Sequence, residues 1–293
     1  MEMHDLIINI VIDPDDGDTT LHLASFLGDT YTIKNILETD DGKKHLNRPV
    51  RPFGSSPLRL ACSAGKADSV QELLKYGADI DFPDIKMQTP LFVAAHMNHV
   101  ECCKLVLQAG ANPNGNAGNL IPPLHIACSR GFAPIVQLLL QHGAELGGTF
   151  AHPLHVAAAT GQLCCFILLL LHGTKTDLLE LENHEPSLQQ VLTKRCEPIF
   201  LELWILFGGK VHEHVEAGPL AEVLLRLTKS PLSLQCQCRI QIWRVMRPNV
   251  IQRLSKLELP RTLIEFLAYR DIPAVYNCVS KVNSILKTDD LLN

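Results

Sequence analysis

One six-residue phrase recurs along the first half of the chain and constrains its fold more than any other feature. The phrase approximates Thr-Pro-Leu-His-x-Ala, and its copies lie at residues 19–24, 56–61, 89–94, 122–127 and 152–157. Successive copies are separated by steps of 37, 33, 33 and 30 residues. A second phrase, a pair of apolar residues followed by glycine, ends at Gly77, Gly110, Gly143 and Gly173, with steps of 33, 33 and 30 residues. Two phrases that keep the same step predict a repeat protein in which each unit contacts its neighbours.

Each position of the two phrases has a role in a pair of helices. Proline suits the first turn of a helix, where its missing N–H costs nothing, and a residue such as Thr89 just before it can cap the exposed amides. The apolar pair belongs to a second helix, and the following glycine can end that helix in a left-handed conformation. The sequence therefore predicts an all-α solenoid of helix pairs.

The period and the phrase resemble the ankyrin repeat. The resemblance implies five clear repeats and a degenerate sixth that ends at Gly208 and Gly209, with atypical repeats at both ends. It also implies that the histidines of the phrase, among them His22, hydrogen-bond to the backbone between repeats. The concave face of such a solenoid holds another protein, through residues that follow the first helix and residues at the hairpin tips. The candidate contacts to a target are Phe26, Ser63, Ile85, Lys86, His96, Met97, Asn119, Ser129, Arg130 and Thr160.

A different pattern follows residue 230. Leu234, Cys238 and Ile242 stand at positions i, i+4 and i+8, which places them on one face of a helix. Taken alone, such a stripe is equally consistent with the face that a helix turns toward its own core. A shorter segment, Leu257-Glu258-Leu259-Pro260, follows downstream.

These elements together resemble a SOCS box, and the whole chain is similar to the ankyrin-repeat and SOCS-box family. In that family a Leu-x-x-x-Cys-x-x-x-Ile element docks on elongin C, which implies that Leu234, Cys238 and Ile242 contact the elongin B/C pair.

A downstream Leu-Pro-x-Pro element of the family helps to select cullin-5 and its RING partner. Leu257, Leu259 and Pro260 match that element, whereas Glu258 replaces its first proline. The resemblance therefore implies elongin docking more firmly than the choice of cullin.

The resemblance also implies a domain organisation and a function. The expected parts are an N-terminal segment (1–15), the ankyrin repeats (16–215), a linker (216–230), a three-helix SOCS box (231–270) and a C-terminal tail without an assigned role (271–293). The implied function is that of a substrate-recognition adaptor in a cullin-5 RING E3 ubiquitin ligase, which holds a target protein for ubiquitination and proteasomal degradation. The alternative is an ankyrin-repeat scaffold or inhibitor that joins no ligase.

Composition and motifs argue against other classes of function. A formal net charge of −5 gives no electrostatic reason to approach nucleic acid or an anionic membrane. The sequence contains no phosphate-binding loop, serine nucleophile elbow or metalloprotease helix, so we expect no catalysis and no cofactor. The pairs His212/His214 and Cys236/Cys238 are each separated by a single residue, unlike the usual ligands of zinc, so we expect no metal.

Cysteine usage and hydropathy bear on the compartment. The ten cysteines lie mainly in apolar surroundings without a Cys-x-x-Cys pair, as expected for small buried thiols of a reduced protein. The longest apolar run, residues 163–171, is far shorter than the roughly 20 residues of a membrane-spanning helix. We therefore expect an intracellular, cytoplasmic protein.

Overall fold

A computed structural model describes residues 17–146, 152–174, 188–209, 220, 232–246, 250–254, 256–257 and 259–286. Across these residues the regular structure is helical, and the β-type pairing amounts to an isolated antiparallel bridge between Val50 and Ser55. The predicted all-α fold is therefore confirmed. The described helices include none that is both long enough and apolar enough to cross a membrane.

The chain forms two compact units. The first contains residues 17–127 and 138–145, and the second contains residues 128–137 and the described residues from 146 onward. The division falls within α9 (Pro123–Arg130) and α10 (Ala133–Gln141).

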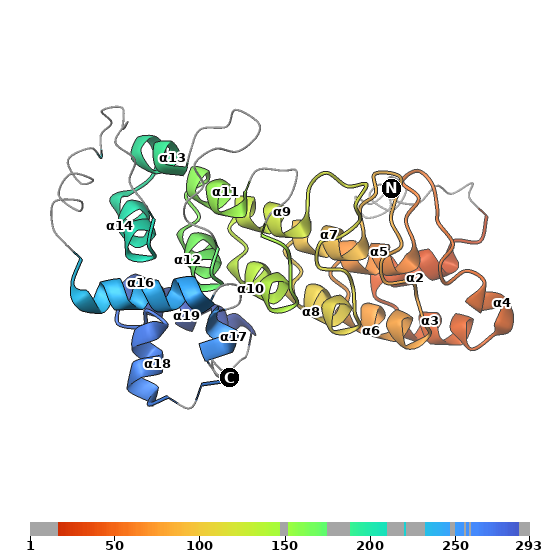
Figure 1. Ribbon diagram of the computed structural model, residues 1–293. Coiled ribbons are helices and arrows are strands. Elements are labelled where there is room, and N and C mark those ends of the chain that lie inside the picture. The colour runs from red at the N-terminus through yellow and green to blue at the C-terminus, as the bar shows by residue number, and fades with distance from the viewer. Residues whose placement is uncertain are drawn as a thin grey trace. The chain divides into compact units, whose positions relative to one another are not determined.

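The first unit is a row of helix pairs, as the repeat period predicts. Its helices are α2 (Thr20–Leu27), α3 (Thr30–Leu37), α4 (Asp40–Lys43), α5 (Pro57–Ser63), α6 (Ala67–Lys75), α7 (Pro90–His96) and α8 (Val100–Gln108). The first helices of the repeats pack side by side in the order α2, α5, α7, and the second helices pack in the order α3, α6, α8 (Figure 1).

The helix ends follow from the phrase residues. Ser56 and Thr89 accept hydrogen bonds through their hydroxyl oxygens from Arg59 N and Phe92 N, at 3.2 and 3.3 Å. The glycines after the second helices adopt the expected left-handed conformation, for example φ +83° at Gly77. Both caps satisfy backbone groups that a helix end leaves without a partner.

Side chains in the loops link one repeat to the next. Backbone N–H groups of Asp79 and Glu145 donate to the side-chain oxygens of Asn47 and Asn114, each at 2.8 Å and across 31 or 32 residues. His22 of the first repeat lies 2.7 Å from the carbonyl oxygen of Arg48 through its Nε2, which confirms the structural role predicted for this histidine. These links satisfy loop backbone groups and fix the spacing of adjacent repeats.

The second unit joins further helix pairs to the C-terminal module. Its remaining helices are α11 (Pro153–Ala159), α12 (Leu163–Leu171), α13 (Leu188–Arg195), α14 (Pro198–Leu206), α16 (Leu234–Met246), α17 (Val250–Leu254), α18 (Arg261–Leu267) and α19 (Pro273–Leu286). α13 and α14 form the degenerate sixth pair, and Gly208 follows α14 at φ +89°.

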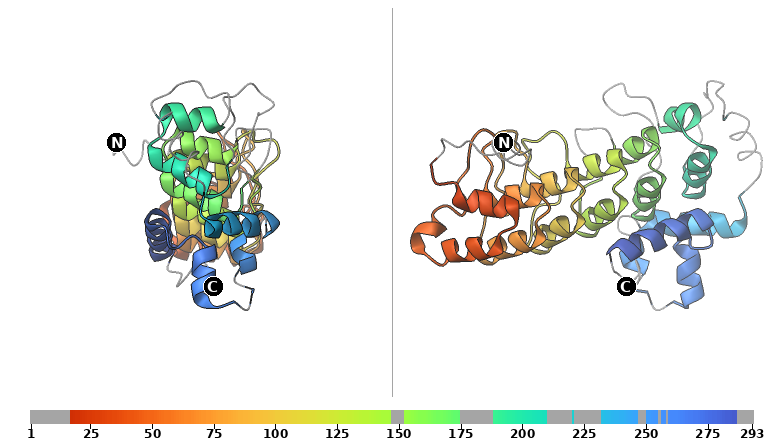
Figure 2. Two further views of the ribbon diagram at one scale, coloured as in Figure 1. Left: turned by 60° about the vertical axis from the view of Figure 1, so that its left-hand side comes forward. Right: turned by 180° about the vertical axis from the view of Figure 1, so that it is seen from behind.

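Helix α12 is apolar around its whole circumference. Its sequence is Leu-Cys-Cys-Phe-Ile-Leu-Leu-Leu-Leu, and its residues from Cys165 to Leu171 are all buried. A helix that is hydrophobic on every side needs neighbours on every side. α11, α14 and α19 supply them (Figure 2).

The third neighbour, α19, comes from the segment for which the sequence indicated no role. Val275, Cys278, Val279, Val282 and Leu286 are buried, and they follow the spacing of one helical face. α19 thus returns the chain from the C-terminal module to the repeat helices of the same unit.

Three aromatic rings join the last helix pair to the C-terminal module. Phe207, after α14, stacks on Tyr269 with ring centroids 3.8 Å apart, and Trp243 of α16 meets both rings edge-on. Tyr269 Oη donates to the carbonyl oxygen of Leu206 at 2.9 Å, and Trp243 Nε1 donates to that of Leu267 at 2.7 Å. We call Phe207, Trp243 and Tyr269 the aromatic cluster.

A buried arginine completes the junction. The guanidinium carbon of Arg239 lies 3.8 Å from the ring centroid of Phe266 and 4.4 Å from that of Tyr269. Its Nη2 donates to Asp271 Oδ2 at 2.8 Å. The charge is therefore held by a carboxylate and two aromatic faces, as a buried guanidinium requires.

Candidate functional site

A groove lies on the first unit, along the first helices of successive repeats and their hairpin tips. It has a volume of about 630 Å³. Its apolar part includes Phe26, Leu60, Phe92 and Met97, and its polar part includes Lys86. A cavity of this size accommodates a short peptide segment or a small ligand.

A buried ion pair lies in the lining of the groove. Arg59 Nη2 lies 2.6 Å from Asp84 Oδ2, and Arg59 Nη1 donates to Ser55 Oγ at 2.9 Å. The side chains of Arg59 and Asp84 are 11% and 1% exposed. Burial lowers the pKa of Arg59, while the Asp84 carboxylate acts in the opposite direction.

The groove brings together half of the predicted contacts to a target. Its lining includes Phe26, Ser63, Lys86, His96 and Met97. Ile85 and Asn119 belong to the same unit but lie outside the lining, and Ser129, Arg130 and Thr160 belong to the second unit.

The sequence did not identify the ion pair in the groove. One sequence feature could have drawn attention to Arg59: it occupies the position of the repeat phrase at which three other copies carry histidine. Nothing in the spacing indicated that Asp84, 25 residues downstream, would be its partner.

The stripe of Leu234, Cys238 and Ile242 lies on the solvent side of α16. Leu234 is 75% exposed, Ile242 is 39% exposed, and Cys238 is exposed. The buried face of α16 carries Arg239 and Trp243 instead. The alternative that the stripe is the helix's own core face is therefore wrong.

The stripe forms one wall of an apolar groove of about 510 Å³. The other wall comes from α18 and includes Leu263 and Phe266. Val245, which the sequence pattern did not single out, is 81% exposed and lies eleven residues after Leu234, on the same face of α16. Large exposed apolar side chains on one face are typical of an interaction surface.

The residues predicted to contact a cullin lie just before α18. Leu257 and Pro260 are exposed and Leu259 is half-buried, with Pro260 at the N-cap of α18. Glu258 lies outside the described residues.

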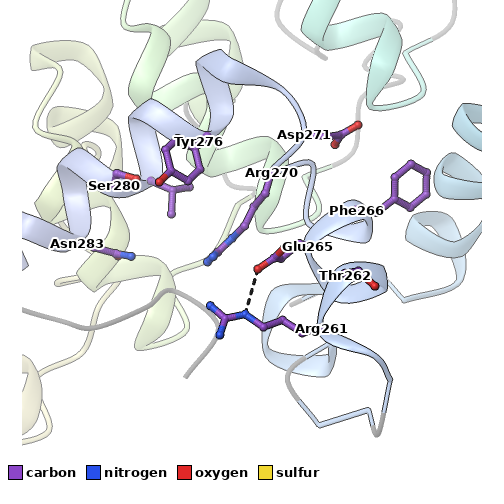
Figure 3. Close-up of a pocket in the computed structure, with 10 residues that line it drawn as sticks. Arg261, Thr262, Glu265, Phe266, Arg270, Asp271, Tyr276, Ser280 and Asn283 are labelled. Atoms are coloured by element: carbon purple, nitrogen blue, oxygen red, sulfur yellow. Dashed lines mark hydrogen bonds and ion pairs between the residues drawn. The ribbon is translucent and has the colours of Figure 1, made fainter.

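A polar pocket of about 680 Å³ lies between α18 and α19 (Figure 3). The side chains of Arg261, Glu265 and Arg270 lie near one another in its lining, and Arg261 Nε donates to Glu265 Oε1 at 3.1 Å. The side chains of Tyr276 and Ser280 line it from α19. Positive and negative charges balance in this lining, so its electrostatics favour no particular ligand.

All ten cysteines are free thiols. Burial raises the pKa of Cys103 and Cys165, the latter to about 12, which keeps these thiols protonated and unreactive. Cys164 differs, because a hydrogen bond with the Cys278 thiol lowers its pKa and Lys281 acts in the same direction. The described part of the chain contains no group of three or more metal-ligating side chains, while His212 and His214 lie outside it.

Two regions of the chain match known protein families. Residues 21–117 and 115–179 match the family described as ankyrin repeats (three copies), and residues 230–268 match the SOCS box. The second match ends just before α19.

Individual relatives match over very different lengths. Ankyrin repeat and SOCS box protein 12 of Mus musculus is 33% identical over 85% of this chain and 91% of its own length. B-cell lymphoma 3 protein homolog of Mus musculus is 33% identical over 45% of this chain, which spans only 30% of that protein. Ankyrin repeat and SOCS box protein 1 of Mus musculus is 38% identical over 26% of this chain and 24% of its own length.

A solved structure shares the repeat fold. The human ASB11 ankyrin repeat domain superposes with a TM-score of 0.59 at 20% sequence identity, covering 73% of this chain and 99% of that domain.

Proposed function

The chain belongs to the family of ankyrin repeat and SOCS box proteins, and from this membership we propose that it recruits target proteins to a cullin-RING E3 ubiquitin ligase. The ankyrin repeats hold the target, and the SOCS box docks on the elongin B/C pair. Cullin-5 and its RING partner complete the assembly through Leu257, Leu259 and Pro260. The free state of all ten cysteines supports a site of action in the reduced cytoplasm.

The observation that carries the proposal is the exposed stripe of α16. Leu234, Cys238 and Ile242 occupy the positions at which the family's elongin-docking element has its contact residues. The side chain of Leu234 is 75% exposed. Burying it in a partner would contribute about 1–2 kcal/mol to the free energy of binding. The stripe is available for such a partner because Arg239 and Trp243 already make the internal contacts of α16.

The contribution of this chain to the reaction is proximity. A ligase adaptor holds a lysine of the target near the thioester of the ubiquitin-conjugating enzyme and so raises its effective concentration. In this role no side chain of the adaptor takes part in forming the isopeptide bond.

The test is co-purification of elongin B/C with the full chain and with the double variant Leu234→Asp, Cys238→Asp. We expect the variant to lose the elongins, because burying two carboxylates in an apolar contact is strongly unfavourable. Its unfolding free energy should change by less than about 0.5 kcal/mol, because both side chains are exposed.

A matched control is Ile285→Asp, which makes the same kind of change at a 47% exposed residue of α19 in the same unit. This variant should retain the elongins. If the unmodified chain does not co-purify with elongin B/C, the ligase proposal fails, and the chain is better described as an ankyrin scaffold or inhibitor.

A further inference from the structure

The groove of the first unit has an unbalanced charge. Three basic side chains line it, those of Arg59, Lys86 and His96. Among the described residues its lining contains a single carboxylate, that of Asp84.

The Asp84 carboxylate is fully engaged within the protein. Its Oδ1 accepts hydrogen bonds from the backbone N–H groups of Lys86 and Gln88, each at 2.8 Å, and its Oδ2 binds Arg59 at 2.6 Å. Because it is also buried, it presents no negative charge to a ligand that enters the groove. An incoming ligand therefore meets the ammonium group of Lys86 without a competing acid beside it.

The same hydrogen bonds hold Lys86 on a rigid hairpin tip. Asp84 N donates to Gln88 O at 3.1 Å, Met87 N donates to Asp84 O at 2.9 Å, and Ile85 N ties the tip to the preceding one through Phe53 O at 3.1 Å. A charge presented by an ordered loop binds with a smaller loss of conformational freedom than one on a mobile loop.

The rest of the lining is predominantly apolar. Phe26, Leu60, Phe92 and Met97 come from three successive repeats, and Met97 is 51% exposed. A volume of about 630 Å³ is too small for a folded domain and suits a short stretch of chain with a large apolar side chain.

We propose that this groove binds a short peptide segment of the target in which a large apolar residue adjoins aspartate or glutamate. The apolar side chain packs between Phe26 and Met97, and the carboxylate pairs with Lys86. This inference rests on the proposed function, since it names the kind of target segment that the repeats select.

The test is selection of a random dodecapeptide display library on the immobilised full chain. We expect the selected peptides to share Leu, Ile, Phe or Met next to Asp or Glu. For a synthetic peptide of that kind, Lys86→Glu should weaken binding about tenfold or more, because an attraction becomes a repulsion. Selection on the Lys86→Glu variant should shift the preference from acidic to basic neighbours.

The matched control is Lys104→Glu, which makes the same charge change on α8, away from the groove lining. This variant should keep the preference for acidic neighbours. Met97→Ala should weaken peptide binding but leave that preference unchanged. Failure to select any peptides, selection without acidic neighbours, or an unchanged preference in Lys86→Glu would each overturn the inference. Elongin co-purification does not involve the groove, so it reports on the ligase proposal independently.

Discussion

Replacing Tyr269 with glycine sets two effects of opposite sign against each other. Tyr269 has φ +57°, a left-handed conformation that costs a residue with a side chain about 1 kcal/mol and glycine almost nothing. Its ring is also buried, stacked on Phe207 and next to Trp243. Glycine therefore relieves the backbone and removes the centre of the aromatic cluster.

The magnitudes decide the outcome. Removing a large buried aromatic side chain costs about 3–5 kcal/mol, and losing the hydrogen bond from Tyr269 Oη to Leu206 O costs about 1 kcal/mol of stability. After the backbone gain of about 1 kcal/mol is subtracted, Tyr269→Gly should destabilise the second unit by about 3–5 kcal/mol. Tyr269→Phe keeps the ring and should cost about 1 kcal/mol.

Urea unfolding followed by tryptophan fluorescence measures this difference. Both tryptophans, Trp204 and Trp243, belong to the second unit. With a denaturant slope of about 2 kcal/mol per molar, the midpoint of Tyr269→Gly should fall by about 1.5–2.5 M. If this variant matched or exceeded the stability of the unmodified chain, the aromatic cluster would not be what holds the C-terminal module to α14.

Three further predictions concern single side chains of the second unit. Burial lowers the pKa of His172 from 6.5 to about 4, so the neutral form is favoured in the folded state and stability falls as the pH drops below 6.5. This histidine should account for about 2 kcal/mol of lost unfolding free energy at pH 5, and urea titrations of His172→Gln should show a correspondingly smaller loss. Iodoacetamide at neutral pH should alkylate Cys164 before the buried thiols, because the hydrogen bond from Cys278 lowers its pKa, and Cys278→Ala should slow the reaction in a mass-spectrometric time course. Gly208→Ala should lower the melting temperature more than Gly161→Ala, since both have positive φ but only the methyl group at Gly208 would lie 2.8 Å from a side chain of α16.

The repeat region was predictable because its signals are local and recur. Ser56 and Thr89 cap helices, and Gly77 ends one, through bonds that span a few residues, so spacing alone identifies them. The same holds for the degenerate sixth pair, whose opening phrase is lost but whose Gly208 retains its position.

The candidate sites were only partly predictable, because sequence periodicity defines a helix face without saying what covers it. Leu234 and Ile242 share a face, yet only the structure shows that this face is exposed. The partnership of Arg59 with Asp84 depends on how neighbouring repeats pack, and no local pattern encodes it. α19 was missed for a different reason: its apolar spacing was present in the sequence, but no family resemblance drew attention to it.

The position of α19 limits how freely evolution or an engineer can exchange the parts of this protein. Because one flank of α12 is covered by α19, which follows the SOCS box in the chain, the fifth repeat and α19 depend on each other. Grafting the SOCS box and α19 onto a foreign repeat array would leave the apolar face of α19 uncovered. A chain cut after Tyr269 would expose the apolar surface of α12 to solvent, which promotes aggregation. Chimeras between relatives should therefore keep residues 152–286 as one inherited block.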